Sequence, residues 1–177
     1  MSNVKKMIIT AVCIALCVIV PMAFHVFPNG GKIFTPMYIP VLLCGLICGT
    51  PYGIICGVLG PIFSSVLTGM PLPVAVPPMI VELATYGAVT GLMMRIIRTG
   101  KTTADLYISL TTAMMVGRVV SGIAKALIFS KGAYSFAIWV TANFVTALPG
   151  VILQLVLVPV IVVTLIKAKV IPARYEW

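Results

Sequence analysis

Among the polar side chains that lie inside long apolar stretches of the sequence, where an unpaired polar group is costly, six are candidates for a binding site. They are Glu82, Tyr86, Arg118, Ser121, Lys125 and Asn143. Arg118, Ser121 and Lys125 are separated by three and then four residues, so a helix would place them on one face. Two cations and one carboxylate would give such a site a net charge of about +1, which suits a small polar ligand that carries a carboxylate.

A structural role for the same side chains is the alternative. Glu82 could pair with Arg118 or Lys125 only to neutralise charge, while Lys125 extends its ammonium group to the membrane surface. Gln154, near the middle of the last apolar stretch, is expected to form a hydrogen bond between helices.

Catalytic constellations are incomplete in this sequence. His25 is the single histidine and has no neighbouring carboxylate or cysteine, so a nucleophilic triad or a zinc site would lack parts. Gly100, Lys101 and Thr102 resemble the end of a phosphate-binding loop, but Arg95 occupies the position of its first glycine. We therefore expect no enzyme activity, ATPase site, cofactor or metal.

Composition places the chain in a membrane. Of its 177 residues, 61% are hydrophobic and 8% are charged, whereas soluble domains have roughly 25% charged residues. Because a helical span needs roughly 20 apolar residues, the chain accommodates about six spans and a single transmembrane domain over residues 1–177. The net charge of +9 lies between the apolar runs instead of forming a basic stripe, which argues against nucleic-acid binding.

Polar residues, proline and glycine interrupt the apolar runs, and these interruptions define the helices of the expected all-α architecture. The spans are predicted at about 7–26, 37–50, 52–67, 77–97, 104–129 and 138–166. The second and third are short and rich in glycine, so a tightly turned helical hairpin is expected around residues 49–52. Close helix packing is expected at glycines that recur every four residues, namely Gly45, Gly49, Gly53, Gly57, Gly87 and Gly91. The five cysteines, Cys13, Cys17, Cys44, Cys48 and Cys56, are interpreted as small core residues.

Positive charges predict the orientation. With six spans, one face receives Lys5, Lys6, Arg95, Arg98, Lys101, Lys167, Lys169 and Arg174, and the other receives Lys32 and Lys131. The positive-inside rule then places both termini in the cytoplasm of a multi-pass plasma-membrane protein. The outer connection 69–78 contains Pro71, Pro73, Pro77 and Pro78, which predicts a stiff extended segment that is either a lid or a plain linker.

The layout resembles the substrate-binding S components of energy-coupling factor (ECF) vitamin transporters. Ala11 and Ala15 match the A-x-x-x-A contact motif of that family, and Glu82-Leu83-Ala84-Thr85-Tyr86-Gly87 with Gly91 looks like its fourth helix. The resemblance implies an S-component bundle that binds a vitamin or vitamin precursor at its outer face. It also implies a transmembrane coupling subunit, which packs on Ala11 and Ala15, and two cytoplasmic ATPases.

The resulting hypothesis is capture of a small water-soluble vitamin-like molecule for ATP-driven uptake. Arg118 and Lys125 would meet its anionic end, Glu82 and Asn143 its hydroxyl or amide groups, and Tyr86 would pack beside it. A pantothenate-like anion fits this chemistry best, and pyridoxine-type, pyrimidine or deazapurine compounds stay open. The alternative is a stand-alone secondary carrier or channel, in which Glu82 would be a protonatable coupling group; a membrane-embedded enzyme is a third possibility.

Overall fold

The computed structural model describes residues 1–24, 35–126, 141 and 147–172, and within these ranges the secondary structure is helical. The membrane-length helices are α1 (Asn3–Phe24), α4 (Thr50–Thr68), α5 (Val76–Ile96), α6 (Thr102–Ala124) and α8 (Leu148–Lys167). A shorter apolar helix, α3 (Tyr38–Cys48), precedes α4. Among the described residues, five helical segments are long and apolar enough to cross a membrane. The expected all-α bundle is confirmed.

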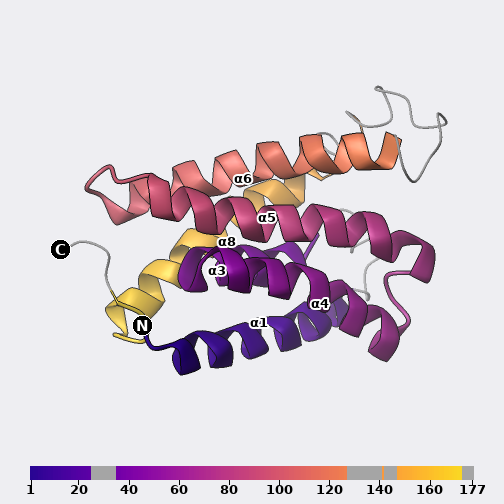
Figure 1. The fold of residues 1–177 in the computed structure, drawn as a ribbon, viewed down its shortest axis with the longest axis horizontal. Coiled ribbons are helices and arrows are strands. Elements are labelled where there is room, and N and C mark those ends of the chain that lie inside the picture. Colours follow the sequence, from indigo (N-terminus) through magenta and orange to yellow (C-terminus); the bar gives the residue numbers. More distant parts are fainter. Residues whose placement is uncertain (25–34, 127–140, 142–146, 173–177) are drawn as a thin grey trace.

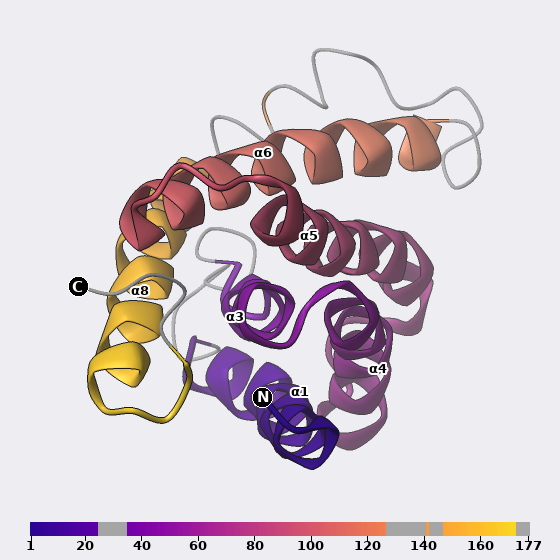
Figure 2. The ribbon, with the colours of Figure 1, turned by 60° about the vertical axis from the view of Figure 1, so that its left-hand side comes forward.

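Helix α3 occupies the centre of the bundle. It is buried on nearly all sides (Figure 2), and its 11 residues extend only about 16 Å, roughly half of a bilayer core. Two apolar clusters meet around it: one joins α3 to α5, α6 and α8, and the other joins α3 to α1 and α4. The short second span predicted from the sequence is therefore a core helix surrounded by longer ones.

The hairpin between α3 and α4 is as tight as expected, with Gly49 alone between the two helices. Gly49 has a φ of 96° and its backbone N–H donates to the Gly45 carbonyl at 3.0 Å. A side chain would strain this left-handed backbone. Gly49 thus terminates a helix instead of packing against one, because a Cβ there would meet nothing within 4 Å.

Close packing is confirmed for the other five glycines. Cβ atoms placed on Gly53 and Gly87 would collide with the opposite backbone, and those on Gly45, Gly57 and Gly91 would likewise meet atoms of a neighbouring helix. Backbone contact of this kind requires small residues. It holds α5 against the α3–α4 hairpin and so sets the position of the polar residues that α5 carries.

The predicted start of the last span, at residue 138, lies outside the described residues, and two other predicted segments differ from the structure. Helix α1 begins at Asn3, ahead of the predicted start, because Lys5 and Lys6 can continue a helix beyond the apolar run. The connection 69–78 is not extended: it contains a 3₁₀ turn at Pro73–Ala75, and α5 begins at Val76 with proline in its first turn. Proline is tolerated there because the first N–H groups of a helix have no intrahelical partner.

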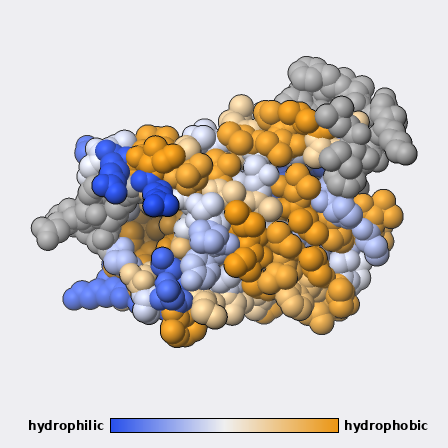
Figure 3. Space-filling view, viewed as in Figure 1, coloured by the Kyte–Doolittle hydropathy of each residue, from blue (hydrophilic) through white to orange (hydrophobic). Residues whose placement is uncertain are grey.

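Apart from Arg118 and Lys125, the cationic residues that the structure describes gather at one end of the bundle. The start of α1, the connection between α5 and α6, and the end of α8 all lie there (Figure 1). The strongly hydrophilic side chains of the space-filling view are found at this end, while apolar side chains cover most of the rest (Figure 3). The turn between α4 and α5 lies at the opposite end (Figure 1).

Candidate functional site

Helices α5 and α6 bring three of the six candidate residues into direct contact. The Ser121 hydroxyl donates to Glu82 Oε2 at 2.7 Å, and the Lys125 Nζ lies 3.1 Å from the same oxygen. The Glu82 and Lys125 side chains are 6% and 27% exposed, and Ser121 is fully buried. A carboxylate is thus held between a hydroxyl and an ammonium group inside the bundle.

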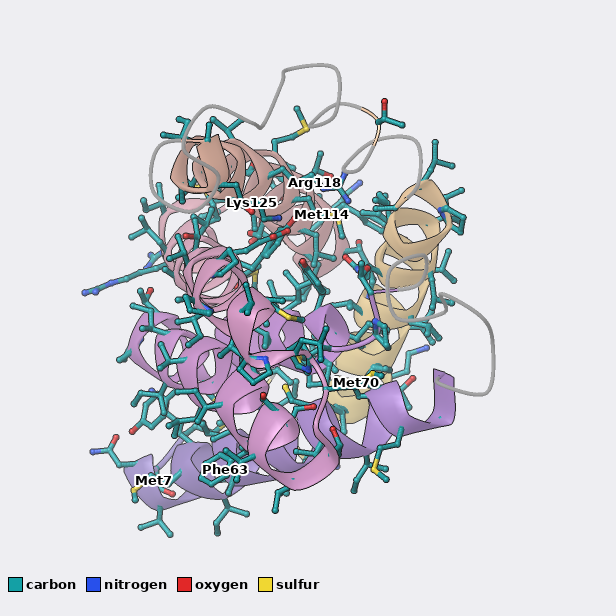
Figure 4. The ribbon with its side chains drawn as sticks, turned by 90° about the vertical axis from the view of Figure 1, so that its right-hand side faces the viewer. Met7, Phe63, Met70, Met114, Arg118 and Lys125 are labelled. Carbon is teal, nitrogen blue, oxygen red and sulfur yellow. The ribbon has the colours of Figure 1, made fainter. Side chains whose placement is uncertain are left out.

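Arg118 and Tyr86 extend this group inward along the same helices. Arg118 is 7% exposed and Tyr86 is 1% exposed. The Tyr86 hydroxyl donates to the Met114 carbonyl at 3.5 Å, and it lies within electrostatic range of Glu82 and Arg118. Figure 4 shows Met114, Arg118 and Lys125 on one stretch of α6, as the helical spacing predicted.

Tyr38, at the start of α3, was not among the residues singled out from the sequence. Its ring packs edge-on against that of Tyr86, with the centroids 5.1 Å apart and the planes at 72°. Its hydroxyl is close enough to Glu82 and Arg118 for their charges to act on it. We therefore include Tyr38 in the polar cluster, which comprises Tyr38, Glu82, Tyr86, Arg118, Ser121 and Lys125.

Gly117 fixes how α6 meets α5 beside the polar cluster. A Cβ on Gly117 would lie 3.0 Å from the Tyr86 ring, so the missing side chain makes the space that the ring fills. With Tyr86 seated on α6 in this way, the next turns of the two helices bring Glu82 level with Ser121 and Lys125. Packing of an aromatic ring on a glycine therefore determines the register of the polar contacts.

Other predicted residues fall outside this contact group. Asn143 lies outside the described residues. Gln154 is 2% exposed and its side-chain amide donates to the Thr35 hydroxyl at 2.8 Å. The hydrogen bond therefore joins α8 to a residue just before α3, and not to another helix as expected. Ala11 and Ala15 are exposed on α1, away from the polar cluster.

The cysteines occupy the apolar cluster between α1, α3 and α4. All five are buried and none forms a disulfide. The Cys44 thiol approaches the Thr10 hydroxyl at 3.5 Å and the Tyr52 carbonyl at 3.4 Å, and the part of the chain that the structure describes contains no group of ligands suited to a metal ion. These thiols are core residues, as expected.

Donors outnumber acceptors in the polar cluster. Arg118 and Lys125 are cations, Ser121 and the two phenols can donate hydrogen bonds, and Glu82 contributes the carboxylate. Such a cluster inside a membrane bundle is a candidate functional site, because burying polar and ionisable groups at membrane depth is expensive. The net positive charge of the cluster would suit an anionic molecule.

A family model for the substrate-specific component of ECF transporters matches residues 5–162 of the chain. The chain belongs to this family. No curated protein matches it. The match extends from the first helix into the last, so it includes every residue of the polar cluster as well as Ala11 and Ala15.

Family membership assigns a role in transport. The chain is a substrate-specific component, a membrane-embedded transporter subunit and not an enzyme. The helices long enough to cross a membrane agree with a multi-pass protein. The resemblance inferred from Ala11, Ala15 and the segment Glu82–Gly87 is thereby confirmed at the level of the family.

Proposed function

We propose that this S component captures a small water-soluble vitamin-like molecule bearing a carboxylate, at the polar cluster. The observation that carries the proposal is the buried contact of Glu82 with Ser121 and Lys125. Arg118 lies on α6 about two turns before Lys125. The polar cluster contains two cations and one carboxylate, so its net charge is positive. An anionic ligand would meet that charge in the buried surroundings of Arg118.

The proposed role of each residue follows from the chemistry of its side chain and from its exposure. Arg118 binds the carboxylate, Ser121 and Glu82 bind hydroxyl or amide groups, and Tyr86 with Tyr38 forms an aromatic wall. Lys125, the most exposed charged member, lies at the entrance. A pantothenate-like anion has this combination of carboxylate, hydroxyl and amide groups; pyridoxine-type, pyrimidine and deazapurine compounds are the competing substrates.

Mass spectrometry of small molecules that copurify with the detergent-solubilised subunit tests the substrate class. We expect a compound with a carboxylate among those released on denaturation and lacking from an Arg118→Ala preparation. A copurifying compound that is cationic, or that is retained equally by the variant, would contradict the anionic assignment.

Energy coupling is proposed to come from other subunits: a transmembrane coupling subunit that packs on Ala11 and Ala15, and two ATPases. The cationic end of the bundle supports an orientation with this end, and hence the chain's amino terminus, in the cytoplasm. The polar cluster would then lie in the outer half of the membrane, near the ends of α5 and α6 that face the exterior.

Reconstitution in liposomes separates this proposal from a stand-alone carrier. Alone, the subunit should bind substrate without accumulating it, even when a proton or sodium gradient is imposed. Addition of the coupling subunit, the ATPases and ATP should produce uptake. Accumulation by the isolated subunit in response to an ion gradient would favour the carrier, with Glu82 as its coupling group.

A further inference from the structure

The turn from α4 to α5, residues 69–75, presents apolar side chains on its surface. Met70, Leu72 and Val74 are 49%, 67% and 89% exposed. The apolar surface continues onto α4, where Val66 and Leu67 are 77% and 69% exposed. Figure 4 looks onto this end of the bundle and labels Met70 on the turn and Phe63 on α4. Exposed apolar surface of this extent marks contact with lipid or protein.

The turn also lacks charge. Residues 33–81 contain no Asp, Glu, Lys, Arg or His, so the whole segment from before α3 to within α5 is uncharged. The connection at the other end of α5 is different: it contains Arg98 and Lys101, and Arg95 lies just before it. Both connections are short and join the same helix to a neighbour, yet only one has the composition of a segment that lies in water.

Backbone N–H groups of the turn are largely satisfied or removed. Pro71 and Pro73 have no N–H group. Gly69 donates to the Ser65 carbonyl at 3.0 Å, Met70 to the Thr68 hydroxyl at 3.3 Å, and Ala75 to the Leu72 carbonyl at 2.7 Å. An unpaired N–H group in hydrocarbon is costly, so a non-helical segment can enter lipid only if its N–H groups are hydrogen-bonded or are lacking, as in proline.

Hydroxyl groups of α4 satisfy carbonyls of the turn. Ser64 donates to the Met70 carbonyl at 2.8 Å, and Ser65 donates to the Pro71 carbonyl at 2.8 Å. The Thr68 hydroxyl lies 3.1 Å from the same Met70 oxygen. These three hydroxyl contacts to two carbonyls fold the turn back onto the helix that precedes it. They hide polar atoms that water would otherwise have to solvate.

We propose that residues 69–75 are inserted into the bilayer, among the acyl chains just below the headgroups, and that lipid is the partner of their apolar surface. The turn is then a fixed membrane anchor at the end of the bundle nearest the polar cluster, and not a lid that moves through water. The proposal depends on the membrane location of the family and is independent of the substrate assignment.

Tryptophan fluorescence in liposomes tests this location. The two native tryptophans are first replaced, as Trp139→Phe and Trp177→Phe, and Val74→Trp is introduced. Val66→Trp on α4 is the lipid-facing control, and Lys101→Trp at the cationic end is the water-facing control. Each protein is reconstituted alone in phosphatidylcholine, with and without bromine on the acyl chains, so no protein partner is present.

Insertion predicts that Val74→Trp emits at a wavelength close to that of Val66→Trp. Its emission should be quenched by lipid brominated near the headgroup end of the chain and be insensitive to acrylamide in the water. Lys101→Trp should show the reverse pattern. Val74→Trp and an equivalent Leu72→Trp that both behave like Lys101→Trp would place the turn in water and overturn the proposal.

Discussion

Replacing Ala11 or Ala15 by tryptophan is expected to abolish uptake by the assembled transporter while leaving substrate binding to the isolated subunit nearly unchanged. Both alanines are exposed one helical turn apart on α1, and an alanine pair at this spacing lets a partner helix approach closely. An indole ring there would separate the two helices. Helix α1 packs chiefly against α3 and α4, whereas Glu82 and Lys125 lie on α5 and α6.

Val160→Trp provides the control for added bulk. Val160 is 56% exposed on α8, so its substitution enlarges a lipid-facing surface without touching α1. Uptake into liposomes and substrate titration should be measured for all three variants. Loss of substrate binding in Ala11→Trp would mean that this alanine packs within the subunit itself. An equal loss of uptake in Val160→Trp would mean that α1 is not a specific contact surface for the coupling subunit.

The hydrophobic runs predicted which segments are helical better than they predicted where each helix begins and ends. A run of apolar residues reports which part of a chain lies at membrane depth, while a helix continues as long as its backbone hydrogen bonds do. For this reason α1 extends back to Asn3 through two lysines. The connection before α5 was predicted to be extended as far as residue 78 because of its prolines. Pro77 and Pro78 instead lie in the first turn of α5, which accepts proline.

The residues of the candidate site were predicted from the free-energy cost of polar groups in apolar runs and from their helical spacing. The contacts between them depend on how the helices pack, which the sequence does not show. Burial of Glu82, Ser121 and Arg118 follows from helical periodicity and from their placement in apolar runs. Which cation would pair with Glu82 could not be deduced, because that depends on the register between α5 and α6 that Gly117 and Tyr86 establish. Tyr38 carried no signal, since a tyrosine at the start of a span is also typical of a membrane-surface anchor.

Arg118→Ala is expected to lower substrate affinity by roughly ten- to a hundred-fold, which corresponds to about 1.5–3 kcal/mol for a charge-assisted hydrogen bond. Arg118 is buried at 7% exposure, so its guanidinium would interact with an anion in surroundings that screen the charge weakly. The helices should still form, because the glycine contacts that hold α5 to the α3–α4 hairpin do not include Arg118.

Lys125→Ala should weaken binding less than Arg118→Ala does. The Lys125 side chain is 27% exposed, whereas Arg118 is 7% exposed, so Lys125 is the more hydrated of the two cations and its charge is screened more strongly. Arg98→Ala, at the exposed cationic end, is the matched control and should leave affinity unchanged. Titration of the three purified variants with the copurified ligand measures the order. Equal affinity in all of them would show that Arg118 and Lys125 serve only to balance charge within the bundle, and the inference of an anionic substrate would then be wrong.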